Sequence, residues 1–397
     1  MSLVPLNVLN FFMADVKDGL GPFLGVFLQG HGWTVDQIGL VMTIGGLVAM
    51  LLTTPMGILV DVIKAKRAII IFAALAMLVA CGFNYFLPTF STTMVAQILA
   101  AIAGASIPTA IAGITLGLVG PTKFDYQLGQ NESYNHGGNA LSAMMAGVFS
   151  YYYGLAAVFA LMGLWAILSI FCVLFIKPQQ IDYDQARGLN NKQHPPMTVS
   201  VLFTNKGLIV LAITVVFFHL ANAAMLPLLS QAMVFRGTAG NPGAYTALTV
   251  IVAQITMIPM ALLAAKFAVT KGYGLVFSLA LCALPIRGIL VGLIQHPYVL
   301  IPVQILDGVG AGLMGVAVPG LVARILRGSG RFNTGLALIL TVQGIGAALS
   351  HSLAGMIAKY INYEGAFLAL SLVAVIGLLI WLAALPFIAS YNTKVVV

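Results

Sequence analysis

Two carboxylates lie three residues apart inside the first long apolar segment of the chain. They are Asp15 and Asp18, and the segment around them is otherwise apolar enough to cross a bilayer. Residues three apart share one face of a helix. An ionisable group at mid-membrane depth is costly unless it faces protein or water. These residues are therefore candidates for a functional site, and Asn7 and Asn10 extend the polar side of the same helix.

Nearby carboxylates in a poorly hydrated site repel one another, and burial further disfavours their charged form. One member of the Asp15 and Asp18 pair is therefore expected to take up a proton readily. That chemistry suits proton coupling, in which a carboxylate is protonated on one side of the membrane and releases the proton on the other. The alternative is that one of them pairs with Lys17 or another helix and only fixes packing.

A second polar pair, His219 and Asn222, is also three residues apart in an apolar segment. Histidine is the side chain that titrates near physiological pH, so His219 is a candidate assistant in proton transfer. It is equally consistent with a histidine that hydrogen-bonds a neighbouring helix.

Two further groups of polar residues enter apolar segments. Glu132 and His136 are four apart and precede Asn139, so they either line the inner mouth of a pathway or form a structural latch against Asp61 and Arg67. The latch is the favoured interpretation, and the ligands are too few for a metal site.

Arg287 and Asp307 lie at similar distances from the turn at His296-Pro297. In an antiparallel helical hairpin they reach the same depth, so we expect a mainly structural ion pair. If Arg287 instead reaches a cavity, an anionic substrate becomes plausible.

Composition places the whole chain in a bilayer. Of its 397 residues, 60% are hydrophobic and only 7% are charged, whereas soluble domains carry roughly 25% charged residues. The mean hydropathy is +1.04. The formal charge of +8 does not indicate nucleic-acid binding, because the basic residues stand at the ends of apolar segments. All three cysteines lie within such segments, so neither disulfides nor a metal site is expected. No cleavable signal peptide is evident either.

Segments of about 20 apolar residues mark bilayer-crossing helices. The sequence predicts twelve of them, near residues 4–29, 37–60, 67–87, 93–119, 131–154, 156–176, 206–231, 244–268, 272–294, 298–322, 332–357 and 364–389. One polar interruption, residues 177–205, separates six from six. We therefore predict an N-terminal six-helix bundle over 1–176, a central cytoplasmic loop over 177–205 and a C-terminal six-helix bundle over 206–397.

Basic residues set the orientation, because cytoplasmic loops carry the excess of lysine and arginine. With a cytoplasmic N-terminus, the outer loops hold only Arg236 and Lys359, and most other basic residues fall inside. Both termini are therefore expected in the cytoplasm.

The two halves resemble one another at a spacing near 205 residues. Phe11-Phe12 with Pro22 in the first segment matches Phe217-Phe218 with Pro227 in the seventh. The repeat places His219 and Asn222 near the depth of Asp15 and Asp18. Parallel repeats of six helices place a substrate site between the halves near the membrane midplane.

The loop between the second and third segments makes a family resemblance specific. It reads Gly57-Ile-Leu-Val-Asp61-Val-Ile-Lys64-Ala-Lys66-Arg67, which resembles the Gly-x-x-x-Asp-x-x-Gly-Arg-Lys/Arg loop motif of the major facilitator superfamily. The six-plus-six architecture agrees over the whole chain. This sequence keeps the glycine, the aspartate and the basic residues but has Lys64 and Ala65 near the usual Gly-Arg.

The resemblance implies a secondary transporter of the all-α superfamily fold. The first helix of each triplet would line a central cavity, and the loop motif Gly57, Asp61, Lys64, Lys66 and Arg67 would gate it. The fourth segment lacks the arginine of many proton-coupled relatives, and the fifth lacks the Gly-Pro-x-x-Gly-Gly element of drug:proton antiporters. The resulting candidates for proton coupling are Asp15, Asp18, His219 and Glu132, and for the cavity Asn10, Asp15, Asp18, His136, Asn139, His219, Asn222, Arg287 and Asp307.

The sequence thus predicts a monomeric, proton-coupled transporter of the bacterial inner membrane that moves a small amphipathic organic solute by alternating access, favouring efflux. A proton symporter that imports a metabolite or siderophore-like compound stays open. A membrane enzyme or a receptor-like component is the other class. No Gly-x-Ser-x-Gly, His-Glu-x-x-His or Walker motif is found, so the chain is expected to be no enzyme, to use no cofactor and to drive no transport with ATP.

Overall fold

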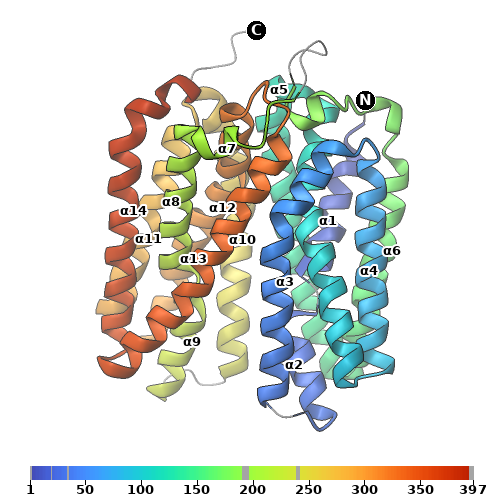
Figure 1. Ribbon diagram of the computed structural model, residues 1–397. Coiled ribbons are helices and arrows are strands. Elements are labelled where there is room, and N and C mark those ends of the chain that lie inside the picture. Colours follow the sequence, from blue (N-terminus) through green and yellow to red (C-terminus); the bar gives the residue numbers. More distant parts are fainter. Residues whose placement is uncertain (1, 19, 34, 190–195, 238–241, 393–397) are drawn as a thin grey trace. The chain divides into compact units, whose positions relative to one another are not determined.

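The computed structural model describes residues 2–18, 20–33, 35–189, 196–237 and 242–392 (Figure 1). Regular secondary structure within these ranges is entirely helical. The long helices and the segments that pair with them are α1 (Val4–Asp18), α2 (Gly21–Gly30), α3 (Val35–Val62), α4 (Lys66–Phe86), α5 (Phe90–Tyr153), α6 (Ala156–Phe175), α8 (Lys206–Asn222), α9 (Met225–Phe235), α10 (Pro242–Thr270), α11 (Tyr273–Leu293), α12 (Leu300–Ile325), α13 (Phe332–Tyr360) and α14 (Tyr363–Asn392).

The predicted fourth and fifth segments form one continuous element, α5, with a break in its middle. Gly120 there has φ 68° and ψ 172°, outside the helical region. A positive φ favours glycine, and the proline that follows cannot continue the hydrogen-bond ladder. The helix on either side of Gly120 therefore supplies two crossing segments, as predicted.

The first and seventh predicted segments are each broken into two helices. α1 ends at Asp18 and α2 begins at Gly21, while α8 ends at Asn222 and α9 begins at Met225. The same offset of 204 residues relates both pairs of boundaries. At the second break, the backbone N–H of Ala224 donates to Ser350 Oγ of α13 at 3.0 Å. The internal repeat is thus present in the helix boundaries as well as in the sequence.

The helices of the described ranges can be matched to the twelve predicted crossing segments. Ten helices in the described ranges are long and apolar enough to cross a membrane, α5 among them, and the shorter Val4–Val16 is also apolar. With α5 counted on both sides of Gly120 and the first segment included, these match the twelve predicted segments. The fold class is therefore an all-α membrane protein of the predicted kind.

Contacts divide the chain into two compact units. Unit 1 comprises residues 1–121, 134–196 and 326–338, and unit 2 comprises 122–133, 197–325 and 339–397. The central loop contains the short helices η1 (Pro178–Gln180), η2 (Gln185–Arg187) and α7 (Val201–Thr204); its residues 190–195 lie outside the described ranges. The bundle boundaries at 176 and 206 stay a prediction. The two compact units are defined by their internal contacts, whereas the predicted bundles are defined by the repeat of six helices along the sequence.

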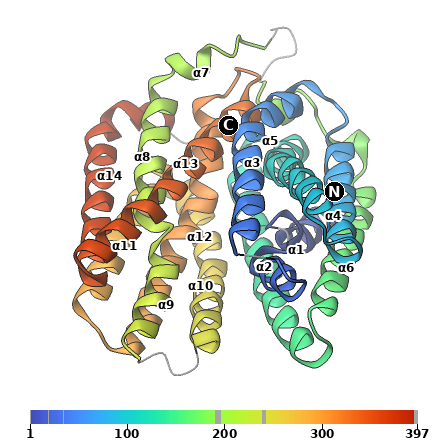
Figure 2. The same ribbon diagram turned by 60° about the horizontal axis from the view of Figure 1, so that its bottom comes forward.

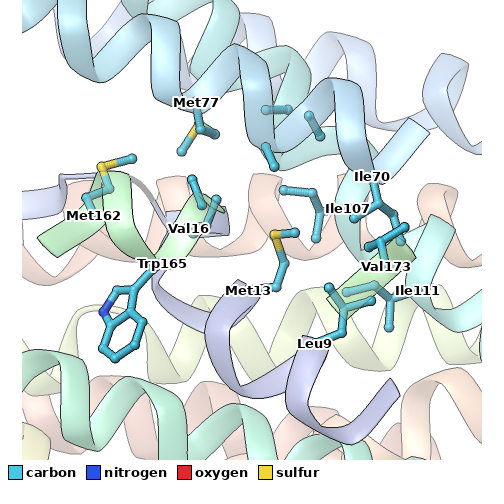
Figure 3. Close-up of a cluster of buried hydrophobic side chains, with 14 of the residues drawn as sticks. Leu9, Met13, Val16, Ile70, Met77, Ile107, Ile111, Met162, Trp165 and Val173 are labelled. Atoms are coloured by element: carbon cyan, nitrogen blue, oxygen red, sulfur yellow. The ribbon is translucent and has the colours of Figure 1, made fainter. Parts of the chain in front are cut away.

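Unit 1 is held by an apolar core between α1, α4, α6 and the first part of α5. α4 and α6 run side by side (Figure 1). Figure 3 shows the interdigitating side chains, which are Leu9, Met13, Val16, Ile70, Met77, Ile107, Ile111, Met162, Trp165 and Val173. The indole Nε1 of Trp165 donates to Ser142 Oγ at 3.1 Å and so ties α6 to the second part of α5.

Unit 2 relies on small residues where helices approach closely. α11 packs against α12 and α14, and α14 packs against α8 (Figure 2). Lipid tails are as apolar as leucine, so close van der Waals contact drives helix association in place of the hydrophobic effect. A Cβ at Gly308 of α12 would lie 2.6 Å from the carbonyl oxygen of Ala253 in α10. Gly308 therefore permits the contact between α10 and α12.

Candidate functional site

The candidate proton carrier on α1 lies beside a tight helix crossing in unit 1. A Cβ at Gly138 of α5 would overlap the Phe11 carbonyl oxygen and would lie 3.1 Å from the Ala14 Cβ. Asp15 follows Ala14 directly and is half-buried. The crossing therefore brings α1 close to the polar stretch of α5. The side chains of Lys17 and Asp18 lie outside the described part of the structure.

Asn10 is buried and uses its polar group within its own helix. Its Nδ2 donates to the Leu6 carbonyl oxygen at 2.9 Å. On the facing helix, Asn139 Nδ2 donates to Asn135 Oδ1 at 3.5 Å. Both candidate cavity residues thus have local hydrogen bonds inside unit 1.

The helix boundaries of the repeat put His219 and Asn222 in the same helical positions as Asp15 and Asp18. The offset of 204 residues that relates α1 to α8 also relates these residues pairwise. His219 is half-buried, and its ring contacts Phe218 with 5.2 Å between centroids. Each residue pair precedes a helix break, so the two polar sites stand at equivalent places in the two repeats.

Arg287 forms the predicted ion pair with Asp307. Its Nη1 lies 2.8 Å from Asp307 Oδ1, with side-chain exposures of 1% and 8%. Nη1 also donates to Asn222 Oδ1 at 2.5 Å, and Nη2 to Gln304 Oε1 at 3.4 Å. The guanidinium thereby joins α11 to α8 and α12. Its charge is compensated inside unit 2, which fits a structural role.

Glu132 and His136 fall in different compact units although they are one helical turn apart. Glu132 belongs to unit 2, where a Cβ on Gly315 of α12 would lie 3.1 Å from its Oε2. His136 belongs to unit 1 and is buried. The helical turn between them is therefore where α5 passes from one compact unit to the other.

Asp61 of the loop motif contacts the start of α13 within unit 1. Its Oδ1 accepts hydrogen bonds from the backbone N–H and Nδ2 of Asn333, at 3.1 and 2.8 Å. Its Oδ2 accepts from the backbone N–H and Oγ1 of Thr334, at 2.8 and 2.6 Å. Free N–H groups and the helix dipole make a helix N-terminus a favourable site for a carboxylate. Asp61 thus accepts hydrogen bonds from backbone N–H groups in the first turn of α13, which have no acceptor within the helix.

The other motif residues serve neighbouring helix ends. A Cβ at Gly57 would lie 2.6 Å from the Asn333 carbonyl oxygen, so glycine permits the approach of α3 to α13. Lys66 Nζ donates to the carbonyl oxygens of Val60 and Ile63 at the end of α3. Lys64 is exposed.

Arg67 and Asp61 each bind the end of a neighbouring helix. Arg67 donates through Nε and Nη2 to the carbonyl oxygens of Val173 and Leu174, each at 3.1 Å, at the end of α6. The carboxylate of Asp61 accepts its four hydrogen bonds from Asn333 and Thr334. Both side chains thus bind groups at helix ends within unit 1, and the latch with Glu132 and His136 stays a prediction.

Sequence reasoning also missed a buried polar cluster in unit 2. Tyr273 Oη donates to Asp125 Oδ1 at 2.7 Å, and Arg324 Nη2 donates to Asp125 Oδ2 at 2.5 Å. The Arg324 guanidinium stacks over the Tyr273 ring at 4.5 Å. The sequence did offer one signal for this cluster. The chain has only ten acidic residues, and Asp125 is one that lies between two apolar segments, where a charged side chain needs a partner.

Comparisons with known proteins agree with this architecture. A sequence profile of the Major Facilitator Superfamily matches residues 6–286. An uncharacterized MFS-type transporter of Mycobacterium tuberculosis, found in two strains, is 37% identical over 398 residues, covering 98% of this chain and 94% of the relative.

Solved structures share the fold at low identity. The human organic anion transporter MFSD10 superposes with a TM-score of 0.73 at 13% identity, covering 96% of this chain and 98% of that one. The Escherichia coli fucose:proton symporter FucP gives a TM-score of 0.72 at 14% identity with the same coverage, and its outward conformation gives 0.74 at 12%. With the profile match and the mycobacterial relative, these findings show that the chain belongs to the major facilitator superfamily, whose members are multi-pass secondary transporters.

Proposed function

We propose that this transporter exports a small amphipathic organic solute across the bacterial inner membrane in exchange for protons. Asp15 or Asp18 carries the proton, and His219 or Glu132 assists. The observation that supports this most is the equivalence of two polar pairs, which stand at the same positions of the repeat, each beside a helix break. The proposal includes a monomeric protein. Both of its termini lie in the cytoplasm, as the distribution of basic residues favours.

A carboxylate beside a helix break has the properties that proton coupling needs. Broken helices in transporters expose backbone groups that bind substrates and ions near the midplane. Asp15 is half-buried, so its protonation changes the cost of burying that part of α1. In this scheme the protonated, neutral site favours one conformation and the charged site favours the other.

The charges of the chain favour a neutral or cationic solute over an anion. Arg287 is neutralised by Asp307 at 2.8 Å and is almost fully buried. Asp15 and Asp18 in contrast contribute negative charge to the first segment. In this proposal an apolar cavity with a few carboxylates selects the solute.

The proposal is tested in everted membrane vesicles with an acid interior, using acridine orange to report the pH gradient. Candidate compounds, with ethidium as the cationic probe, are added to vesicles that contain the transporter. An exchanged solute is expected to dissipate the gradient as protons leave the vesicles. Replacing the carrier by asparagine removes its titratable group and is expected to reduce this signal to that of vesicles without transporter. Asp15→Asn has this effect if Asp15 is the carrier, and Asp18→Asn has it if Asp18 is the carrier.

Asp182→Asn is the matched control. Asp182 lies in the loop after α6, where its Oδ1 accepts from the backbone N–H groups of Asp184 and Gln185, and an asparagine oxygen can accept the same bonds. Full proton exchange in both Asp15→Asn and Asp18→Asn would contradict the proposed carrier. Acidification in place of dissipation would show that the solute moves with the proton.

A further inference from the structure

Part of the central loop is a folded element, residues 181–189, which we call the strap. It contains the short helix η2. The carboxylate of Asp182 accepts hydrogen bonds from the backbone N–H groups of Asp184 and Gln185, at 3.0 and 3.1 Å. Ala186 is fully buried. The strap therefore has internal hydrogen bonds and a buried side chain, which an open connection between two bundles does not need.

One side of the strap lies on α5, just before the break in that helix. The residue four positions after Gly117 is Pro121, which has no N–H group and cannot donate to the Gly117 carbonyl oxygen. The backbone N–H of Asp182 donates to that oxygen instead, at 2.9 Å. A Cβ at Gly117 would lie 2.8 Å from the Asp182 carbonyl oxygen and 2.9 Å from Ala186 Cβ. Pro121 thus leaves an acceptor open, and Gly117 leaves the room for the strap to reach it.

The other side of the strap binds the start of α13. Asn333 Nδ2 donates to the Ala186 carbonyl oxygen at 2.9 Å, and the backbone N–H of Gly328 donates to the Gly188 carbonyl oxygen at 2.6 Å. A Cβ at Gly188 would lie 3.1 Å from Phe332 Cβ. Two carbonyl groups of the strap therefore hold the loop before α13 and the first turn of that helix.

This contact concerns a helix that is divided between the two compact units. The first turns of α13, up to residue 338, belong to unit 1 together with the strap and the first part of α5, and the rest of α13 belongs to unit 2. The strap donates no charge to the contact. Neutral hydrogen bonds contribute little net stability, because water can replace them. A contact of this kind can be broken and remade in a conformational equilibrium.

We propose that the strap is a releasable latch for the start of α13. While it binds Asn333 and Gly328, the first turns of α13 stay in unit 1. When it releases them, these turns are free to move with the part of the helix that belongs to unit 2. The strap itself stays on α5, where Ile181 and Ala186 are buried against Gly117. The latch involves none of the proposed proton carriers.

Gly117→Ala tests the latch from the side of α5. The three heavy atoms nearest to a Cβ at Gly117 all belong to the strap, so this change displaces the strap without a new contact to α13. Hydrogen exchange is measured in the purified full-length protein over residues 183–189 and 332–336. Exchange at the start of α13 is expected to accelerate by about fivefold or more, as the loss of two hydrogen bonds implies.

Gly147→Ala is the matched control. Gly147 also lies in α5, but a Cβ there would meet nothing within 4 Å. Both variants gain the same helix propensity, so the control isolates the displacement of the strap. It is expected to leave exchange over both segments as in the unmodified protein.

A second pair of variants tests the latch from the side of α13. Asn333→Leu removes the bond to the Ala186 carbonyl oxygen, and Thr334→Val removes only a bond to Asp61. Asn333→Leu is expected to accelerate exchange of the strap, residues 183–189, by about two- to tenfold, as the loss of one hydrogen bond implies. Thr334→Val is expected to change exchange of the strap less than Asn333→Leu does.

Unchanged exchange at the start of α13 in Gly117→Ala would overturn the proposal, whatever happens to the strap itself. An equal acceleration in Gly147→Ala would overturn it as well, as would a strap that responds no more to Asn333→Leu than to Thr334→Val. These measurements need neither a solute nor a proton gradient, so the latch and the proposed proton exchange fail separately.

Discussion

At the residue scale, the buried ion pair of unit 2 shows what local geometry can predict. Arg287 and Asp307 were expected to meet because they lie at similar distances from one turn, and the structure confirms their contact at 2.8 Å. The bonds of Arg287 to Asn222 and Gln304 were not expected. Asn222 lies 65 residues away in the chain, and such a contact follows from helix packing that no local spacing encodes.

Removing one partner of this pair should destabilise the protein strongly. Asp307→Asn leaves a buried guanidinium uncompensated, which typically costs about 3–5 kcal/mol. Replacing both residues together, by Arg287→Met and Asp307→Leu, should recover most of the loss, since two apolar side chains need no partner. Thermal unfolding in detergent at a fixed scan rate gives the melting temperature of each variant, and these temperatures rank the variants by stability.

A half-buried ion pair of the central loop provides the comparison. Arg187 and Asp184 lie 2.6 Å apart with side-chain exposures of 28% and 30%. Ion pairs that reach solvent contribute about 0–1 kcal/mol, so Asp184→Asn should lower the melting temperature far less than Asp307→Asn does. A double variant at Arg287 and Asp307 that melts below both single variants would contradict the structural role given to the buried pair.

At the element scale, hydropathy predicted the crossing segments but not their breaks. A window of 20 residues averages over the turn at Leu20 and over the two-residue interruption after Asn222, and both halves of each broken helix are apolar. The start of α13 was placed correctly, yet its role was missed. Asn333 and Thr334 are 272 and 273 residues from Asp61. The sequence does not show which residue packs against the start of a helix, so this contact could not be predicted from it.

The contact between Asp61 and α13 should protect the first amides of that helix. Asp61→Asn replaces one carboxylate oxygen by an amide that cannot accept, so it should lose about half of the four bonds. A hydrogen bond to a charged group contributes about 1.5–3 kcal/mol. Hydrogen exchange in the peptide over residues 332–336 should therefore accelerate by about tenfold or more.

Lys64→Gln is the neighbouring control, because Lys64 is exposed. It should leave exchange at the start of α13 as in the unmodified protein. Unchanged protection in Asp61→Asn would show that other groups hold this helix end.

At the scale of the whole molecule, the repeat links the fold to the proposed activity. The offset of 204 residues relates α1 to α8 and α2 to α9, and it pairs Asp15 with His219 and Asp18 with Asn222. One half thus carries carboxylates where the other carries an imidazole and an amide. In the proposed mechanism this asymmetry confines proton binding largely to the first repeat.

The most direct test of proton coupling compares two modes of transport in proteoliposomes. A compound that dissipates the gradient in vesicles is followed once under an imposed pH gradient and once in exchange against unlabelled compound without a gradient. Exchange needs solute binding and conformational change but no net proton movement. We predict that the Asn variant of the carrier, Asp15 or Asp18, retains exchange and loses gradient-driven uptake. Gradient-driven uptake that persists at the full rate in both variants would contradict the account.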